Sequence, residues 1–333
     1  MRSQATSLGT AIESKIQRTL PRLHAWYRKH HRPLPWRTRP TPYRTAVAEF
    51  MCQQTRITTV IPYYQRWMQA FPGWDRLAKA SFSRVLRMWE GLGYYRRARF
   101  LHSLARAVVR LPGRELPADP DLLRQLPGIG DYTAGAIASI AFGRPAPAFD
   151  GNVARVLGRL AARQGKSPNT SDLRGWAERM VPPKKPGIHN QALMELGALV
   201  CLPRKPRCPL CPLGQVCPSR KKLPSSPRLR LTPSRRIEYI LLPARNGKVW
   251  LTQTHPQSRW RGLSFLPTTS HPPRGKPRMK ITYPFTRYLI QSSVFISSRP
   301  PAGILGRWVR SVELRRVALP APHRKILRHL GFD

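Results

Sequence analysis

The spacing of apolar residues divides the chain into a helical part and a part that contains strands. From about residue 8 to residue 200, apolar residues recur three or four positions apart, as at Val60, Tyr64 and Met68. This spacing places them on one face of a helix. Proline–glycine pairs interrupt these stretches at 72–73, 112–113 and 127–128, where we expect turns. The first part is therefore predicted to be all-helical.

The pattern changes near residue 237. Short apolar stretches at 239–242 and 248–251 predict strands, and residues 322–330 predict a terminal helix. Between the two parts, residues 218–236 hold seven basic residues, four prolines, four serines and no acidic residue, which is typical of a linker lying along phosphate. We therefore expect a helical domain over 8–217, a basic linker over 218–236 and a smaller α/β domain over 237–333.

The charge of the chain points to a polyanionic partner. Lysine and arginine number 59 against 15 acidic residues, which gives a formal net charge of +44. The sequence contains no run of about twenty apolar residues, which is the length needed to span a bilayer. We therefore expect nucleic acid as the partner and no membrane. Glu13 makes the first twenty residues unlike a transit peptide, and five cysteines are too few for a disulfide scaffold. We expect a cytoplasmic protein.

Four cysteines are concentrated in seventeen residues, Cys201, Cys208, Cys211 and Cys217. Four thiolates in one loop can surround a metal centre, and this spacing alone allows either an iron–sulfur cluster or a zinc ion. Three basic residues lie between the first two cysteines, at positions 204, 205 and 207, where a metal-held loop would present them outward. Cys52, the fifth cysteine, is interpreted as an ordinary buried thiol.

Residues 126–130 read Leu-Pro-Gly-Ile-Gly between two predicted helices. The glycines Gly128 and Gly130 would allow a tight reversal with free amide groups at the start of the second helix, a way of holding a DNA phosphate. An ordinary Pro-Gly turn is the alternative. Asp131 is expected to cap the second helix.

Glu49 lies on a helix that Thr41 and Pro42 are expected to start. No lysine or arginine is within its reach on that helix, and a carboxylate among apolar neighbours tends toward a raised pKa, which suits a general acid. The alternative is that Glu49 points to solvent. Asp150 is expected to cap the helix after it, a role compatible with catalysis.

Several of these residues belong to motifs that are shared with one family. The chain resembles the MutY-type adenine DNA glycosylases of the endonuclease III superfamily. The matching motifs occur in collinear order: LPWR at 34–37, AEFMCQQT at 48–55, EGLGYY at 90–95, LPGIGDYTAGA at 126–136, FDGNV at 149–153 and NQAL at 190–193. The resemblance implies an all-α helix-hairpin-helix glycosylase domain with a loop that binds a [4Fe-4S] cluster, followed by a Nudix-like α/β domain.

The resemblance also implies roles for individual residues. Glu49 would protonate adenine at N7, Asp150 would stabilise the positive charge on the sugar, and Asn152 would help hold the site together. Bifunctional relatives carry a lysine where this chain has Tyr132, and because a phenol forms no imine we expect a monofunctional enzyme. The implied DNA and base contacts are the wedges Gln54 and Tyr94 with Thr55 and Leu92 nearby, and the adenine-pocket residues Trp36, Arg37 and Gln191.

The C-terminal part resembles the family's Nudix-like domain through residues 260–267 and 319–323. Its only acidic residues from 237 onward are Glu238, Glu313 and Asp333, too few for magnesium-dependent diphosphate hydrolysis. The resemblance implies recognition of 8-oxoguanine instead. In the loop where many relatives carry Phe-Ser-His, this chain has Phe285, Thr286 and Arg287.

Taken together, we expect a monomeric glycosylase that excises adenine opposite 8-oxoguanine or guanine in double-stranded DNA of the bacterial nucleoid. Two other functions remain open at this point: a glycosylase with lyase activity on damaged pyrimidines, and a DNA-binding protein without catalysis. Tyr132 argues against the lyase, and Glu49 with Asp150 argues against a protein without catalysis.

Overall fold

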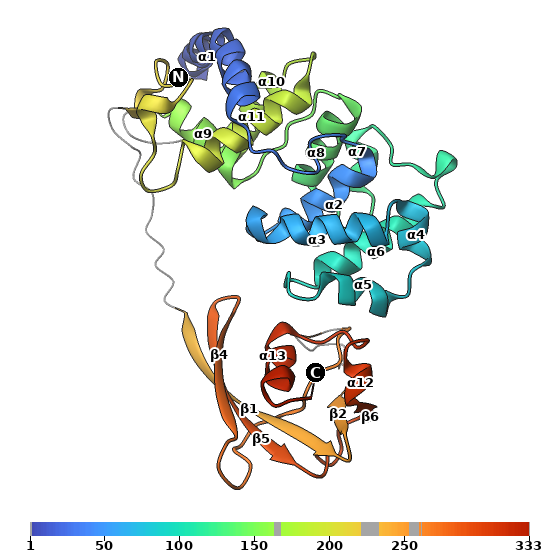
Figure 1. Ribbon diagram of the computed structural model, residues 1–333. Helices are drawn as coiled ribbons and strands as arrows, with labels where there is room; N and C mark the ends of the chain where they lie inside the picture. Colours follow the sequence, from blue (N-terminus) through green and yellow to red (C-terminus); the bar gives the residue numbers. More distant parts are fainter. Residues whose placement is uncertain (1, 163–167, 221–232, 253–259, 261, 333) are drawn as a thin grey trace. The chain divides into compact units, whose positions relative to one another are not determined.

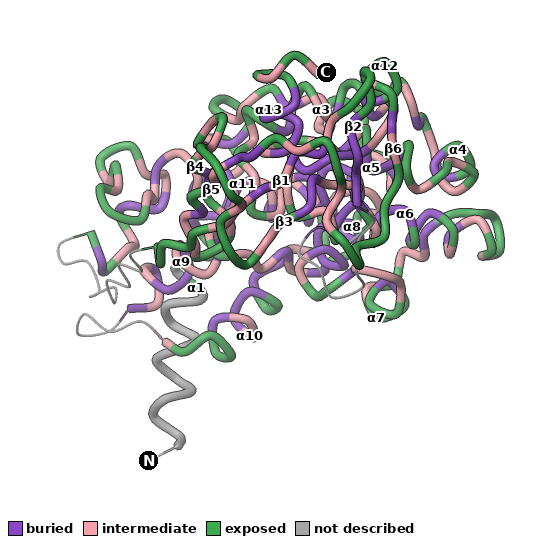
Figure 2. Tube along the Cα trace, turned by 90° about the horizontal axis from the view of Figure 1, so that it is seen from below, coloured by how far each residue is buried: buried purple, intermediate pink, exposed green. Residues whose placement is uncertain are grey.

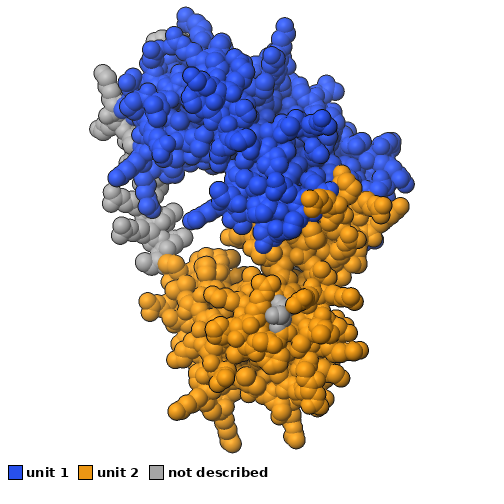
Figure 3. Space-filling view, in the orientation of Figure 1, with its two compact units in different colours: residues 1–68, 73–75, 103–227 blue, residues 69–72, 76–102, 228–333 orange. Residues whose placement is uncertain are grey.

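The computed structural model describes residues 2–162, 168–220, 233–252, 260 and 262–332. The chain forms two compact units, which Figure 3 distinguishes by colour. The first unit contains residues 1–68, 73–75 and 103–227, and the second contains residues 69–72, 76–102 and 228–333. The second unit therefore combines a short helical segment with the whole C-terminal part of the chain.

The described residues up to Leu199 form helices and no strand, as predicted (Figure 1). The α-helices of the chain are α1 Arg2–His30, α2 Pro42–Cys52, α3 Ile57–Ala70, α4 Trp74–Lys79, α5 Phe82–Trp89, α6 Arg96–Val108, α7 Pro120–Arg124, α8 Asp131–Phe142, α9 Gly151–Leu160, α10 Thr170–Met180, α11 Pro186–Leu199, α12 Ser311–Leu314 and α13 Ala321–His329. Short 3₁₀ turns occupy Pro112–Arg114, Cys208–Leu210 and Pro218–Arg220.

Polar residues that accept hydrogen bonds from the first free amide groups begin several helices. The Thr41 hydroxyl accepts from the Arg44 amide at the start of α2, and Asp119 accepts from the Asp121 amide at 2.7 Å at the start of α7. Asp150 begins α9 in the same way, as its Oδ1 accepts from the Val153 amide at 2.7 Å. The predicted caps at Thr41 and Asp150 are confirmed.

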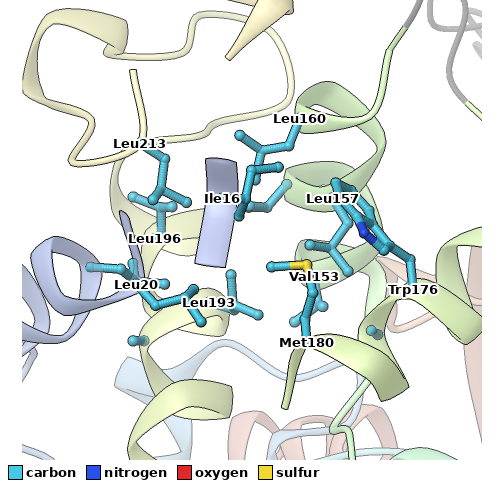
Figure 4. Packing of buried hydrophobic residues seen from close by; sticks show 14 of the residues in the cluster. Ile16, Leu20, Val153, Leu157, Leu160, Trp176, Met180, Leu193, Leu196 and Leu213 are labelled. Atoms are coloured by element: carbon cyan, nitrogen blue, oxygen red, sulfur yellow. The ribbon is translucent and has the colours of Figure 1, made fainter. Parts of the chain in front are cut away.

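The first unit is held by an apolar core between α1, α9, α10 and α11, shown in Figure 4. Ten of its members are labelled there: Ile16, Leu20, Val153, Leu157, Leu160, Trp176, Met180, Leu193, Leu196 and Leu213. Helix α11 also packs against α8, which in turn packs against α2. These contacts bring together the helices that carry the candidate catalytic residues.

Two glycines allow the helices of the first unit to approach closely. A Cβ atom on Gly197 of α11 would lie 2.6 Å from the Cβ of Asn152. One on Gly135 of α8 would overlap the carbonyl group of Pro147. Since real Cβ atoms essentially never approach other heavy atoms this closely, α9 and α11 are in direct contact beside Asp150.

The second unit contains a sheet of strand order β4-β5-β1-β2-β6, with β3 pairing with β1. Its strands are β1 Ser234–Arg245, β2 Lys248–Thr252, β3 Thr268–Thr269, β4 Met279–Phe285, β5 Tyr288–Ser297 and β6 Gly306–Arg310. Strands β1 and β5 run parallel, with Ser234 opposite Tyr288, and the other pairs are antiparallel. Figure 2 marks the buried positions along these strands.

The buried side of this sheet packs on α12 and α13. Its core contains Ile240, Leu242, Val249, Leu251, Leu266, Val294, Val309, Leu314, Leu319, Ile326 and Leu327. The predicted strands at 239–242 and 248–251 and the predicted terminal helix are confirmed within a few residues. Most of the expected linker lies outside the described residues, and the expected domain boundaries stay a prediction. In the described ranges, no helix is long and apolar enough to cross a membrane.

Candidate active site

A cavity of about 570 Å³ opens in the first unit. Its volume lies within the usual range for small-molecule sites. Most of the residues that the sequence predicted for catalysis and adenine binding line it together: Trp36, Arg37, Glu49, Gln54, Thr55, Tyr132, Asp150, Asn152 and Gln191. The expectation that these distant motifs form one site agrees with their arrangement.

Glu49 of α2 lies in the wall of this cavity and forms a hydrogen bond with Tyr132 of α8. The tyrosine hydroxyl donates to Oε2 of Glu49 at 2.6 Å and also lies 3.3 Å from Sδ of Met194. Burial raises the pKa of Glu49 to about 7, although the hydrogen bond from Tyr132 opposes this rise. The negative charge of Asp150 raises this pKa further. The alternative in which Glu49 points to solvent is therefore wrong.

Asp150, at the start of α9, accepts a hydrogen bond on each of its two carboxylate oxygens. Its Oδ1 accepts from the Val153 amide, and its Oδ2 accepts from Nδ2 of Asn152 at 2.9 Å. Arg155 in turn donates to Oδ1 of Asn152 and to the carbonyl of Gly197, both at 2.8 Å. The carboxylate is therefore held in one orientation by a network that spans α9 and α11.

Glu195 on α11 is a residue that the sequence reasoning missed. Its carboxylate is buried and accepts from Nε and Nη2 of Arg32 and from Nη2 of Arg37, at 2.8 to 2.9 Å. Burial alone would raise the pKa of Glu195, but the hydrogen bonds from the two arginines outweigh it and hold the pKa at about 2. The signal was available, because Glu195 follows Gln191 by one helical turn in a chain with few acids.

The expected adenine-pocket residues are themselves held by aromatic neighbours. The Trp36 ring contacts Tyr64 at a centroid distance of 5.1 Å, and the Arg37 guanidinium lies 5.5 Å from the ring of Tyr27. The Tyr27 hydroxyl donates to Oε1 of Gln191 at 3.1 Å. A pocket with aromatic and hydrogen-bonding side chains suits a nucleobase.

Backbone strain coincides with the expected DNA contacts. In the part of the chain that the structure describes, six non-glycine residues have positive φ, and three of them are Gln54, Tyr94 and Thr286. A β-branched residue such as Thr286 adopts this conformation rarely. Such strain persists where the surrounding structure enforces it, and it gathers at functional sites.

The predicted hairpin connects α7 to α8. Gly128 has a φ of 78°, and with Gly130 it lines a shallow hollow beside Tyr132. The expected cap at Asp131 is wrong, because Gly130 precedes the helix and Asp131 is its first residue. Arg174 donates to Asp131 at 2.8 Å and so offsets the negative charge beside the glycines.

The four-cysteine loop is arranged around one small cavity, which all four of the cysteines line. Nη1 of Arg159 lies 3.2 Å from the sulfur of Cys201. A Cβ atom on Gly214 would lie 3.1 to 3.2 Å from the carbonyl oxygens of Cys211 and Cys208, a tight fit. The three basic residues of the loop are exposed, as predicted. Among the described residues, no group of three or more histidine, cysteine, aspartate or glutamate side chains is placed to hold a metal ion. Four thiols that line one cavity are nevertheless the kind of donor set that iron–sulfur clusters take.

The remaining expected DNA contacts lie in the second unit. Leu92 is buried, whereas Tyr94 is 49% exposed. Phe285 and Thr286 line a separate cavity of about 1380 Å³ together with Tyr94. Arg287 lies against its neighbour Tyr288, with Nε donating to the tyrosine hydroxyl at 3.1 Å.

Comparisons with known proteins identify the family. Residues 47–182 match the HhH-GPD superfamily of base excision DNA repair proteins. The adenine DNA glycosylase of Buchnera aphidicola from Acyrthosiphon pisum is 32% identical over 250 residues, which cover 73% of this chain and 71% of the relative. The chain belongs to the adenine DNA glycosylase family. The resemblance inferred from the sequence motifs is thereby confirmed.

Two other adenine DNA glycosylases that match this chain are considerably longer than it. The human adenine DNA glycosylase is 37% identical over 346 residues, which cover 93% of this chain and 62% of the human protein. The chain thus spans about three fifths of that relative and about half of the rat relative. Among solved structures, a thermostable thymine-DNA glycosylase matches with a TM-score of 0.58 at 27% identity, over 64% of this chain and 98% of that chain. The helical glycosylase fold is confirmed.

Proposed function

We propose that this chain is a monofunctional adenine DNA glycosylase that excises adenine opposite 8-oxoguanine or guanine in duplex DNA. The observation that carries the proposal is the hydrogen-bonded pair of Glu49 and Tyr132 in a cavity that Asp150 also lines and that is large enough for a nucleobase. A general acid works best when its pKa is near the working pH. A pKa of about 7 leaves roughly half of Glu49 protonated at neutral pH.

Glu49 is the proposed proton donor. Adenine leaves a sugar poorly until a ring nitrogen is protonated, and protonated Glu49 would supply that proton to N7 and afterwards help to activate water. Tyr132 remains neutral, because burial and the nearby charge of Glu49 raise its pKa well above 10. It therefore orients the Glu49 carboxyl group as a hydrogen-bond donor.

Asp150 is the proposed electrostatic stabiliser. Positive charge develops on the sugar as the glycosidic bond breaks, and a fixed carboxylate beside the sugar lowers the energy of that state. Asn152 and the amide of Val153 hold both Asp150 oxygens, so the negative charge is already in place when the base arrives.

The bound adenine would be extruded from the duplex into the cavity, because its glycosidic bond is out of reach inside the stack. Trp36, Arg37 and Gln191 are the proposed pocket walls. Gln54, with its strained backbone, is the proposed wedge beside Thr55, and Tyr94 is a second wedge near Leu92. The amides at Gly128 and Gly130 would hold a phosphate of the same duplex.

Tyr132 supports the monofunctional assignment. Strand cleavage through a Schiff base requires an amine nucleophile, and a phenol cannot form an imine. We therefore propose that the enzyme stops at the abasic site and leaves the strand intact.

The four cysteines are the proposed ligands of a [4Fe-4S] cluster. Soft thiolates select iron–sulfur clusters over hard cations. The cluster would fix the loop and hold Arg204, Lys205 and Arg207 toward the DNA backbone.

The C-terminal part is proposed to be Nudix-like and to read the base opposite adenine. Phe285, Thr286 and Arg287 are its proposed reading loop. Glu238 of β1 accepts hydrogen bonds from the hydroxyls of Tyr283 on β4 and Ser292 on β5, at 3.0 and 3.1 Å. Its carboxylate therefore connects neighbouring strands of the sheet. We infer that one copy of the chain acts on duplex DNA, and the location at the nucleoid stays a prediction.

The test is single-turnover excision on duplexes with adenine opposite 8-oxoguanine, guanine or thymine, with alkali added after the reaction. We expect alkali-labile sites with the first two duplexes and none with adenine opposite thymine. A Glu49→Gln protein should bind the 8-oxoguanine duplex and leave the adenine in place. Excision of a pyrimidine instead of adenine, or equal rates on all three duplexes, would overturn the proposal.

A further inference from the structure

A buried ion pair connects two distant segments inside the second unit. Arg324 of α13 donates from Nε to Oε1 of Glu90 at 2.6 Å and from Nη2 to Oε2 at 2.9 Å. The Leu319 amide also donates to Oε2, at 3.3 Å. The two side chains are only 9% and 16% exposed, and 234 positions separate them in the sequence.

The remaining donors of Arg324 are also used. Nη1 donates to the carbonyl of Leu314 at 2.9 Å, and Nη2 donates to that of Val317 at 2.7 Å. Arg324 therefore holds the end of α12 and the turn after it as well as Glu90. Buried ion pairs add little net stability compared with apolar residues of the same size, and in several proteins their role is to favour one arrangement over others.

Glu90 directly precedes a tightly turned loop. Gly91, Gly93 and Tyr94 have φ values of 100°, 71° and 48°. The indole of Trp89 donates to the Gly93 carbonyl at 3.0 Å, and Arg97 donates to the same carbonyl at 3.1 Å. Since the loop is braced on both sides, the position of Glu90 fixes the position of Tyr94.

Arg324 is connected to the proposed reading loop through aromatic rings. His323 precedes it and accepts from the Leu266 amide at 3.0 Å. The Trp260 ring contacts His323 at a centroid distance of 5.8 Å and Phe285 at 5.2 Å. Phe285 ends β4 directly before the strained Thr286.

A second close contact lies beside the ion pair. A Cβ atom on Gly262 would lie 3.0 Å from the Phe82 ring and 3.1 Å from Nη2 of Arg99. Gly262 also has a φ of 89°, which a larger residue rarely adopts. The helical segment and the C-terminal part of this unit therefore also lie close together at Gly262, where the positive φ disfavours a larger residue.

These contacts border the cavity of about 1380 Å³. Gly91, Tyr94 and Arg99 line it from the helical segment, and Trp260, Phe285 and Thr286 line it from the C-terminal part. We propose that Glu90 and Arg324 are positioning residues that hold the Tyr94 loop and the Thr286 turn at a fixed separation across this cavity. The pair thereby sets the preference for 8-oxoguanine over guanine opposite adenine.

This inference rests on the proposed function, since the preference must exist before the pair can control it. The expected effect is specific to the opposite base. In this proposal the Thr286 turn contacts an undamaged guanine less than it contacts 8-oxoguanine. Displacing the turn should therefore reduce the excision rate on the 8-oxoguanine duplex more than the rate on the guanine duplex.

The test compares single-turnover excision rates on the two duplexes for full-length Glu90→Gln, Arg324→Gln, Arg324→Lys and the double Glu90→Gln/Arg324→Gln protein. The matched control is Glu313→Gln, which removes an exposed pair with Arg310 in the same unit. We expect the ratio of the two rates to fall about tenfold in each glutamine variant, to fall less in Arg324→Lys and to fall no further in the double variant. The control should keep the wild-type ratio.

The outcomes separate this inference from the proposed function. A wild-type protein with equal rates on both duplexes overturns the proposed specificity and this inference with it. A wild-type preference that the pair variants keep, including equal losses on both duplexes, overturns this inference alone. An equal fall of the ratio in Glu313→Gln also overturns it, because the effect would then be general. Arg324→Lys keeps the positive charge, so the ratio of the two rates can still be measured on this variant if the glutamine variants do not fold.

Discussion

The Tyr132 hydroxyl donates a 2.6 Å hydrogen bond to the carboxyl group of Glu49. The bond joins the second residue of α8 to the last turn of α2. The hairpin that is proposed to hold DNA therefore leads directly into the residue that orients the general acid. It also opposes the effect of burial on the Glu49 pKa, which stands at about 7. The pH dependence of excision follows from this balance.

Single-turnover excision should fall above about pH 7, because only protonated Glu49 can donate to adenine. Tyr132→Phe removes a hydrogen bond that lowers this pKa, so the decline should move to higher pH. Below pH 7, Glu49→Gln should lose roughly 10²- to 10⁴-fold in rate, and this loss should shrink at higher pH as the wild-type Glu49 deprotonates. The exposed Glu115→Gln serves as control. An unchanged decline in both variants would show that another group titrates.

The same group affects folding stability. The folded-state pKa of Glu49 lies above the ordinary value of 4.5, so its contribution is fully present below pH 4.5 and is lost as the pH rises through 7. Relative to Glu49→Gln, the wild-type free energy of unfolding should decline over that window by at most about 1.4 kcal/mol per pH unit. Urea unfolding at several pH values measures the difference.

Loss of one partner from the buried Glu195 site should be costly. Glu195→Gln leaves Arg32 and Arg37 without their counter-charge, and we expect a loss of about 3–5 kcal/mol in the free energy of unfolding. Because the folded pKa of about 2 lies below 4.5, the wild-type advantage is present above pH 4.5 and is lost as the pH falls toward 2. Asp75→Asn breaks an exposed pair with Arg114 and should cost at most about 1 kcal/mol.

Borohydride should trap no covalent complex between the enzyme and DNA, because Tyr132 cannot form an imine. Strand breaks should appear only after alkali. A bifunctional lyase run in parallel shows that the trapping conditions work. Efficient trapping of the wild-type chain would mean that another amine attacks the sugar.

Affinity for undamaged duplex should fall steeply with salt, at about 0.9 logarithmic units for each neutralised phosphate. Replacing Arg204, Lys205 and Arg207 with alanine should reduce that slope by up to about 2.7 if each contacts one phosphate. Measurements at several salt concentrations give the slope directly. An unchanged slope would show that the cysteine loop does not contact the DNA backbone.

Arg287→His should increase the discrimination between 8-oxoguanine and guanine and weaken general DNA binding. An arginine offers only donors and cannot accept from the 2-amino group of the damaged base, whereas a histidine can. Arg287 instead lies on Tyr288, beside Arg236, whose Nη2 donates to the same hydroxyl at 3.0 Å. If both quantities stay unchanged, either this loop does not align with the Phe-Ser-His loop of the relatives or it does not read the base. A solvated surface arginine is the alternative interpretation of Arg287.

Local sequence signals predicted much of the fold. The caps at Thr41 and Asp150, the hairpin glycines and the period of the apolar residues each act within a few positions, so they could be read without the structure. The order of the sheet could not, because the parallel pairing of β1 with β5 joins residues more than fifty positions apart.

The site shows the same limit. Glu49 and Asp150 could be proposed from their motifs, but Glu195 could not be assigned to Arg32 and Arg37, which precede it by about 160 positions. Glu90 looked like part of a loop motif until Arg324 was found beside it. Ion pairs of this kind depend on tertiary packing and leave no periodic pattern in the sequence.

The contact between Gly197 and Asn152 has a consequence for the substrate. Because α9 and α11 touch with no space for a methyl group, Asp150 cannot move toward α11. The hydrogen bonds of Arg155 to Asn152 and to the Gly197 carbonyl oppose separation of the two helices, so the cavity does not widen readily. The compliant partner in the encounter is therefore the duplex. A base pair whose stacking is already weak yields to this stiff protein sooner, so the ease of deforming DNA becomes a first filter that operates before any atom of the base is read.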